Sequence, residues 1–114
     1  MDDASRTKFL ERLHQEILTL RQTEIATAAD RVPVELDQTS VGRLSRMDAM
    51  QQQAMATAQA RRRAGRLRAL ENAIRRVETD EFGWCEECGE PIPEGRLEID
   101  PTSTRCVACA GGNR

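Results

Sequence analysis

The stretch that decides the fold is WCEECGEPIPEGRLEIDPTSTRCVAC, residues 84–109. It holds all four cysteines of the chain in two CxxC pairs separated by 17 residues: Cys85 with Cys88, and Cys106 with Cys109. A tetrahedral Zn²⁺ takes four thiolates at about 2.3 Å, and each CxxC turn supplies two of them. Pairs separated by roughly 15–20 residues are typical of such sites. The spacing therefore predicts one structural zinc ion, with no coordination position left open for water or a substrate.

The surroundings of the two pairs give further expectations. Gly89 follows the first pair, where the turn favours a residue that tolerates unusual φ angles. Two disulfides, or four unrelated thiols, are the alternative interpretation of the cysteines. We expect a short hairpin, punctuated by prolines, between the pairs. A small apolar cluster is expected beneath the zinc, formed by Phe82, Trp84, Ile92, Leu97 and Ile99.

The composition of the 114 residues is unusual for a globular domain. Two Phe, one Trp and no Tyr exclude a large aromatic core, and 32% charged residues suit long helices. The net charge of −2 implies neither a nucleic-acid nor a membrane partner. Its distribution is uneven, because residues 42–78 hold nine arginines against three acidic residues, whereas residues 80–114 hold eight acidic residues against three arginines. A basic helix is therefore expected to precede an acidic zinc module.

The compartment follows from what the sequence lacks. The amino-terminal residues are acidic and amphipathic, without the apolar region of a signal peptide. No apolar run approaches the roughly 18 residues of a membrane span. Together with metal-type cysteine spacing, these features predict a soluble cytoplasmic protein.

Apolar periodicity predicts two long helices. Residues 4–30 carry one stripe at steps of three and four: Phe9, Leu10, Leu13, Ile17 and Leu20. Residues 31–42 interrupt the pattern with Pro33 and Gly42. Residues 43–79 resume it along a second seam, which we expect to end at Gly83. That seam contains Leu44, Met47, Met50, Ala54, Thr57, Ala58, Leu67, Leu70, Ile74 and Val77.

These helices set the expected fold class, which is mainly α. A second helix of roughly 55 Å cannot be buried in so small a protein. We expect a long antiparallel helical hairpin, a coiled-coil finger, over residues 1–79 with its tip at about 31–42. A small zinc-finger module of the four-cysteine type is expected over residues 80–114.

Catalysis is not expected. The chain has one His, no Tyr and no glycine loop that could cradle a phosphate, so no catalytic constellation is visible. His14 lies off the apolar stripe and has no ligand partner three or four residues away, which is typical of a surface histidine.

Two groups of residues are candidate contact sites. Five arginines lie within eight residues: Arg61, Arg62, Arg63, Arg66 and Arg68. They form either a solvated face or a contact for an anion, such as a phosphate, a nucleotide or an acidic protein surface. Sustained binding to duplex DNA, sequence-specific binding included, is not expected, because the attached acidic module would repel the phosphate backbone. At the tip, Asp48 and Ala49 lie just inside the second helix, and Asp37 lies in the preceding connection.

The segment ETDEFGWCEECGEPIPEGRLEIDPTSTRCVAC resembles the C4 zinc module of the DksA/TraR family of bacterial transcription factors. The resemblance is specific over about residues 74–109 and architectural before them. It implies a monomeric protein that binds bacterial RNA polymerase and inserts its finger through the secondary channel. It also implies modulation of transcription initiation, in the family often together with the alarmone ppGpp in the stringent response.

Two departures from the family pattern bear on the sites that the resemblance implies. The family tip reads D-x-x-D-x-A, and an arm shorter by three residues aligns it with Ser45, Asp48 and Met50, so Asp48 is the candidate acid and Asp37 the reserve. The family positions that contact ppGpp correspond to Arg62, Gly65, Ala69, Asp100 and Ala110. Only Arg62 is basic, so the participation of ppGpp stays open, with an action independent of ppGpp as the alternative.

Two other functions stay open at this point. One is a zinc-ribbon adaptor or nucleic-acid-binding protein that uses the arginine-rich helix. The other is a redox switch in which oxidation of the zinc thiolates releases the metal.

Overall fold

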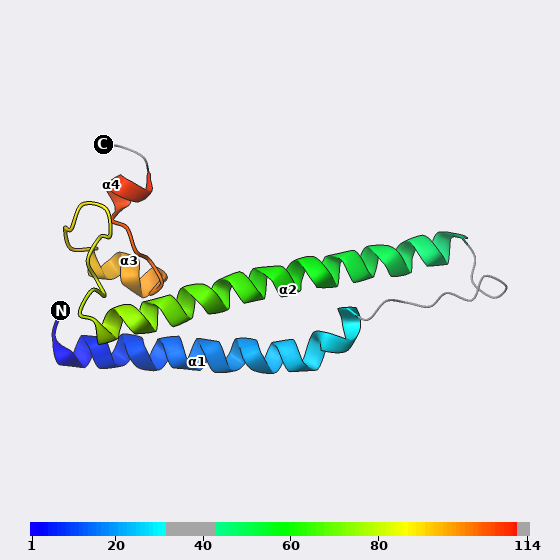
Figure 1. Cartoon of the computed structure of the whole chain (residues 1–114), viewed down its shortest axis with the longest axis horizontal. Helices are drawn as coiled ribbons and strands as arrows, with labels where there is room; N and C mark the ends of the chain where they lie inside the picture. The colour runs from blue at the N-terminus through cyan, green and yellow to red at the C-terminus, as the bar shows by residue number, and fades with distance from the viewer. Residues whose placement is uncertain (32–42, 112–114) are drawn as a thin grey trace. The chain divides into compact units, whose positions relative to one another are not determined.

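The computed structural model describes residues 1–31 and 43–111, and these are mainly helical (Figure 1). The long helices are α1, Asp3–Thr27, and α2, Arg43–Glu78, and a 3-10 turn, η1, spans Ala28–Arg31. Two short helices follow: α3, Glu94–Ile99, and α4, Val107–Ala110. No strand occurs among these residues, and the sole extended pairing is an isolated bridge between Trp84 and Pro91. The mainly α class and the hairpin-like pairing of two long helices are confirmed. Asp37 and most of the expected tip lie outside the described residues.

The chain divides into two compact units, and each long helix contributes to both. Unit 1 comprises Met1–Leu18 and Leu67–Arg114, and unit 2 comprises Thr19–Arg66. Within each unit, a stretch of α1 runs antiparallel to a stretch of α2 (Figure 1).

Unit 1 has an apolar core at the helix pair. The α1 stripe buries Phe9, Leu13 and Ile17, because steps of four residues keep them on one helical face. The α2 side chains buried in the same core are Leu70, Ala73 and Val77. Leu13, Leu70 and Leu97 are 0% exposed, so van der Waals packing and apolar burial stabilise this unit.

The carboxyl end of α2 is fixed against the start of α1. The Arg6 guanidinium donates to the Val77 carbonyl oxygen at 2.8 Å and to the Asp80 carboxylate at 2.9 Å. The Phe9 and Phe82 rings pack with their centroids 5.6 Å apart. The helix predicted over residues 43–79 ends at Glu78, and Asp80, three residues before Gly83, takes the first left-handed turn with φ of 60°. A short polar side chain tolerates that conformation better than most residues.

Unit 2 pairs its helices without a buried core. None of residues 19–31 and 45–66 is fully buried. The predicted seam is therefore wrong for Met47 and Met50, whose side chains are 56% and 62% exposed. The helical period was right, but those two methionines have no covering side chains among the described residues of the unit.

The contrast between two leucines on α1 can be tested. Leu13→Ala removes a fully buried side chain and is expected to lower the free energy of unfolding by about 3 kcal/mol. Leu18→Ala, at a position that is 51% exposed, should change it by less than about 0.5 kcal/mol. Urea unfolding followed by circular dichroism measures both. Similar losses for the two variants would contradict the core described for unit 1.

Candidate metal centre

The four cysteines converge on one point in unit 1. Their sulfur atoms all lie within 4.8 Å of one another, and the Cys88 and Cys106 sulfurs are 3.7 Å apart. Tetrahedral coordination at about 2.3 Å places two sulfurs about 3.8 Å apart. No disulfide joins any of the four cysteines, so the disulfide alternative is wrong. The donor set suits one structural zinc ion.

Backbone hydrogen bonds shape the two cysteine turns. The Cys85 amide donates to the Glu90 carbonyl at 2.8 Å, and the Gly89 amide donates to the Cys85 carbonyl at 2.9 Å. Gly89 has a φ of 75°, which a side chain would strain. The Glu86 amide donates to the Thr104 carbonyl at 2.8 Å and joins the first turn to the segment before the second. In the second pair, Cys106 directly precedes α4 and Cys109 lies within it.

The backbone around the first turn favours thiolate at Cys85. The Cys88 amide is the largest influence, and with the Cys106 and Glu87 amides it outweighs burial and lowers the pKa of Cys85 to about 6. At Cys88, the Glu90 amide favours the thiolate, but the Cys85 sulfur and burial oppose it and the pKa is raised. Four thiolates confined to one site repel one another, and a divalent cation removes that repulsion. The site is therefore chemically suited to Zn²⁺ rather than to four neutral thiols.

Between the cysteine pairs, the expected hairpin is replaced by α3. Pro93 precedes the helix and has a φ of −54°, which suits the start of a helix. Of the apolar cluster predicted beneath the zinc, Leu97, Phe82 and Ile92 are buried. The predicted apolar cluster is wrong for Trp84 and Ile99, which are 49% and 84% exposed.

Two arginines that the sequence analysis did not single out hold the zinc module to the long helices. Arg12 of α1 donates to the Glu98 carbonyl and, at 3.4 Å, to the Ile99 carbonyl at the end of α3. A basic side chain near carbonyl groups at a helix end is favourable. Nothing in the sequence distinguishes Arg12 from a solvated arginine, because its acceptors are backbone atoms far along the chain.

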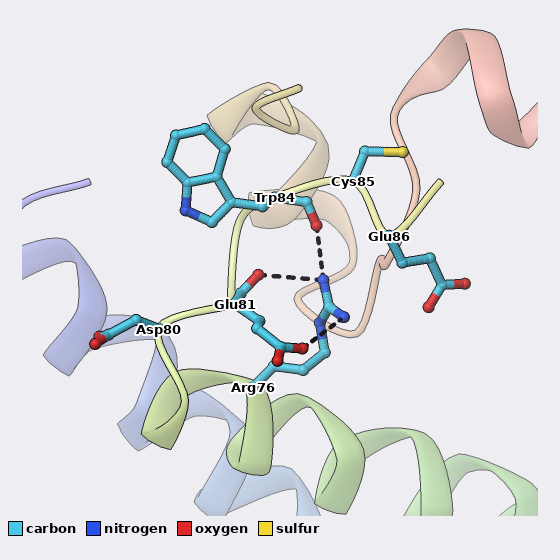
Figure 2. A pocket seen from close by; sticks show the side chains of 6 residues that line it. All are labelled: Arg76, Asp80, Glu81, Trp84, Cys85 and Glu86. Atoms are coloured by element: carbon cyan, nitrogen blue, oxygen red, sulfur yellow. Dashed lines mark hydrogen bonds and ion pairs between the residues drawn. The ribbon is translucent and has the colours of Figure 1, made fainter. Parts of the chain in front are cut away.

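Arg76 is the second of these arginines and is only 9% exposed. Its guanidinium donates to the Glu81 carbonyl at 3.1 Å and to the Trp84 carbonyl at 2.6 Å. It also forms an ion pair with the Glu81 carboxylate at 3.7 Å. Figure 2 shows this guanidinium reaching into the loop that leads to Cys85, beside a pocket of about 340 Å³. Arg76 therefore positions the backbone of the first cysteine turn.

The other predicted site residues lie on α2. Asp48 is exposed and Ala49 is half-buried, while Asp37 lies outside the described part of the chain. Among the clustered arginines, Arg61, Arg62 and Arg68 are exposed and Arg66 is half-buried. The remaining one, Arg63, donates to the Glu24 carboxylate of α1.

The role of Arg76 gives a prediction about metal retention. Arg76→Met keeps much of the side-chain volume but removes the donors to the Glu81 and Trp84 carbonyls. We expect one zinc per chain in the parent protein and faster zinc transfer from the variant to a chromogenic chelator. Arg75→Met changes an exposed neighbour on the same helix and is the matched control. Equal transfer rates for the two variants would show that Arg76 does not support the site.

Comparison with known proteins places this module. Residues 80–113 match the prokaryotic dksA/traR C4-type zinc-finger family. The RNA polymerase-binding transcription factor DksA of Caulobacter vibrioides is 53% identical over 38 residues, which are 33% of this chain and 27% of that protein. The protein of the same name from Escherichia coli is 40% identical over 43 residues, 38% of this chain and 28% of that protein. The matches thus span less than a third of the relatives' length.

A solved structure extends the similarity to the fold. Transcription factor DksA2 from Pseudomonas aeruginosa superposes with a TM-score of 0.78 over 98% of this chain and 84% of its own, at 23% sequence identity. At this identity the likeness shows the fold alone. With the cysteine geometry and the match over residues 80–113, this part of the chain is a zinc module of the prokaryotic dksA/traR C4-type family.

Proposed function

We propose that this protein is a transcription regulator that binds bacterial RNA polymerase. The observation that carries the proposal is the match of its zinc module to relatives named RNA polymerase-binding transcription factors. The similarity of fold to DksA2 supports extending the comparison to the helical part of the chain. The proposal includes that the protein acts as a monomer, that it works in the cytoplasm, and that it is not an enzyme. Among residues 1–31 and 43–111, no helix has both the length and the apolar character of a membrane span.

The proposed mechanism divides labour between two parts. Residues 80–114 form the zinc module, which gives the protein a rigid base because a bound metal restricts the chain. Residues 1–79 form the finger, which enters the secondary channel of the polymerase and modulates initiation. Zinc has a structural role in this mechanism, since four cysteines saturate its coordination.

Asp48 is the proposed working residue of the finger. Asp48 is the sixth residue of α2, which begins at Arg43, and it is exposed. A position within regular helix limits the directions in which the side chain can point. An exposed carboxylate at this place can interact with the metal ions or basic groups that a polymerase uses to handle phosphates.

The proposed action is independent of ppGpp. Arg62 is exposed and is the one basic residue among the positions aligned with the ppGpp contacts of the family. A single guanidinium provides fewer charge-assisted hydrogen bonds to a polyphosphate than a cluster of basic residues does. We assign Arg61, Arg62 and Arg68 instead to contacts with acidic or phosphate groups of the polymerase complex.

Exposed arginines also support a second candidate, a nucleic-acid-binding adaptor. Its affinity for DNA or RNA would fall steeply with salt, because arginine–phosphate contacts release counterions. A gel shift with arbitrary DNA and RNA at physiological salt separates the two functions. The polymerase-binding function is expected to give no shift.

Polymerase binding and the role of Asp48 can be measured separately. The protein should co-elute with bacterial RNA polymerase at micromolar concentration, and failure to do so would refute the proposal. Asp48→Asn removes the charge with little change of shape, so polymerase affinity should stay within about twofold while the effect on initiation is lost. Asp30→Asn alters another exposed acid of the described chain and should retain the effect. An active Asp48→Asn variant would assign the working residue elsewhere.

A further inference from the structure

The helix pair of unit 2 differs from that of unit 1 in what holds it together. No residue among 19–31 and 45–66 is fully buried, whereas unit 1 buries three apolar side chains of α1. Small residues such as Ala58, Ala60 and Gly65 are half-buried at this part of α2. Small side chains on one helix insert little between the side chains of the other helix. They therefore do little to fix how far one helix is shifted along the other, which is the register of the pair. Something else has to set that register.

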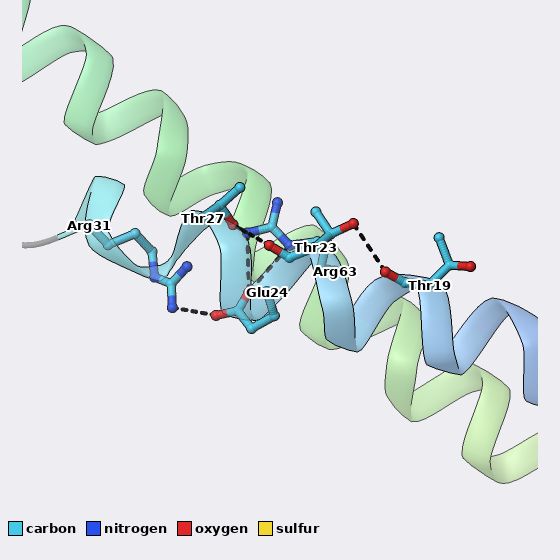
Figure 3. A network of polar contacts seen from close by, with 6 residues as sticks. All are labelled: Thr19, Thr23, Glu24, Thr27, Arg31 and Arg63. Carbon is cyan, nitrogen blue, oxygen red and sulfur yellow. Dashed lines mark hydrogen bonds and ion pairs between the residues drawn. The ribbon is translucent and has the colours of Figure 1, made fainter.

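A polar network crosses between the helices at this place (Figure 3). The Glu24 Oε2 atom accepts from Arg63 Nε at 3.2 Å and from Arg63 Nη2 at 3.1 Å. Arg63 Nη2 also donates to Thr27 Oγ1 at 2.9 Å. One guanidinium of α2 therefore contacts residues on two successive turns of α1.

The acceptors in this network are themselves fixed. The Thr27 hydroxyl donates to the Thr23 carbonyl at 2.8 Å, which leaves its lone pairs for Arg63. The other oxygen of Glu24 accepts from Arg31 of η1. Hydrogen bonds from Arg63, with the charge of Arg31, hold the pKa of Glu24 below its ordinary value.

Burial separates Arg63 from its neighbours. Its side chain is 14% exposed, whereas Arg61 and Arg62 are exposed. The guanidinium uses a planar fork for Glu24 and a further bond to Thr27, a pattern that lysine cannot reproduce. Sliding α1 along α2 by one turn, about 5.4 Å, would break these bonds together.

We propose that Glu24, Thr27 and Arg63 form a polar clamp that fixes the register of α1 against α2 within unit 2. The register sets where Asp48, in the same unit, lies relative to α1. The structural part of this inference stands alone, and the consequence for transcription rests on the proposed function of Asp48.

Spin–spin distance measurement tests the register directly. Ketone-bearing amino acids at Gln22 and Gln59, both exposed in unit 2, accept spin labels without using the cysteines. The parent protein should give one narrow distance distribution. Arg63→Met should broaden it or add a population displaced by about 5.4 Å. An unchanged narrow distribution in Arg63→Met would overturn the clamp.

Arg31→Met is the matched control, because Arg31 pairs with the same carboxylate of Glu24 from the adjoining turn of the chain. It should keep the parent distribution, since it does not link α1 to α2 through its side chain. A change as large as that of Arg63→Met would mean that the charge around Glu24, and not the cross-helix bonds, is what matters, which contradicts the proposal. The reversed pair Glu24→Arg with Arg63→Glu, made together with Arg31→Met so that no second guanidinium faces position 24, should restore a narrow distribution that either single reversal loses.

A transcription assay distinguishes failure of the clamp's positioning role from failure of the proposed function of the protein. Arg63→Met should leave polymerase affinity within about twofold and weaken the effect on initiation by about tenfold or more, as misplacement of an acting group does. The reversed pair should recover the effect, and zinc content should stay at the parent value in every variant. If the parent protein itself has no effect, the proposed function fails while the distance data still decide the clamp. If the parent acts and Arg63→Met acts equally, the positioning role is refuted.

Discussion

Four sulfur atoms must approach within bonding distance of one ion, and unit 1 is arranged to satisfy that requirement. The cysteine turns alone cannot meet it, because each is a short loop with exposed acidic residues around it. Amide donors bring Cys85 toward the thiolate form, and the Glu86–Thr104 hydrogen bond ties the two turns together. Phe82 packs against Phe9 of α1, and Leu97 is buried in the same unit. Metal binding and apolar packing thus support each other in a unit with few aromatic residues.

The two units use different physical means to pair the same two helices. In unit 1, apolar side chains pack together, and this apolar interaction is strong, non-directional and insensitive to salt. In unit 2, the specific contacts are charge-assisted hydrogen bonds with defined geometry. Apolar burial stabilises a pairing, whereas directional bonds choose among alternative pairings of similar energy. A protein that must present one residue accurately gains from the second kind of contact near that residue.

Periodicity and spacing predicted the larger features. The helix expected over residues 43–79 is observed as Arg43–Glu78, and the zinc site follows from the spacing of the cysteines. Side-chain exposure was harder to predict, because periodicity gives a face but not whether another element covers it. Met50 and Ile99 lie on plausible apolar faces and yet are exposed. Arg12 and Arg76 escaped prediction for another reason: their acceptors are backbone carbonyls, which every residue type provides equally.

The same property of Arg76 has a consequence for how relatives of this protein can diverge. Its hydrogen bond to the Trp84 carbonyl depends on the path of the backbone and not on the identity of the side chain at position 84. Mutations at position 84 can therefore accumulate without disturbing this bond, provided that the backbone keeps its course. Position 81 differs, because the Glu81 side chain also forms an ion pair with Arg76. Covariation between positions 76 and 84 will be weak in an alignment, although the contact is close. The arginine itself has no such freedom, so evolutionary drift in this loop is one-sided.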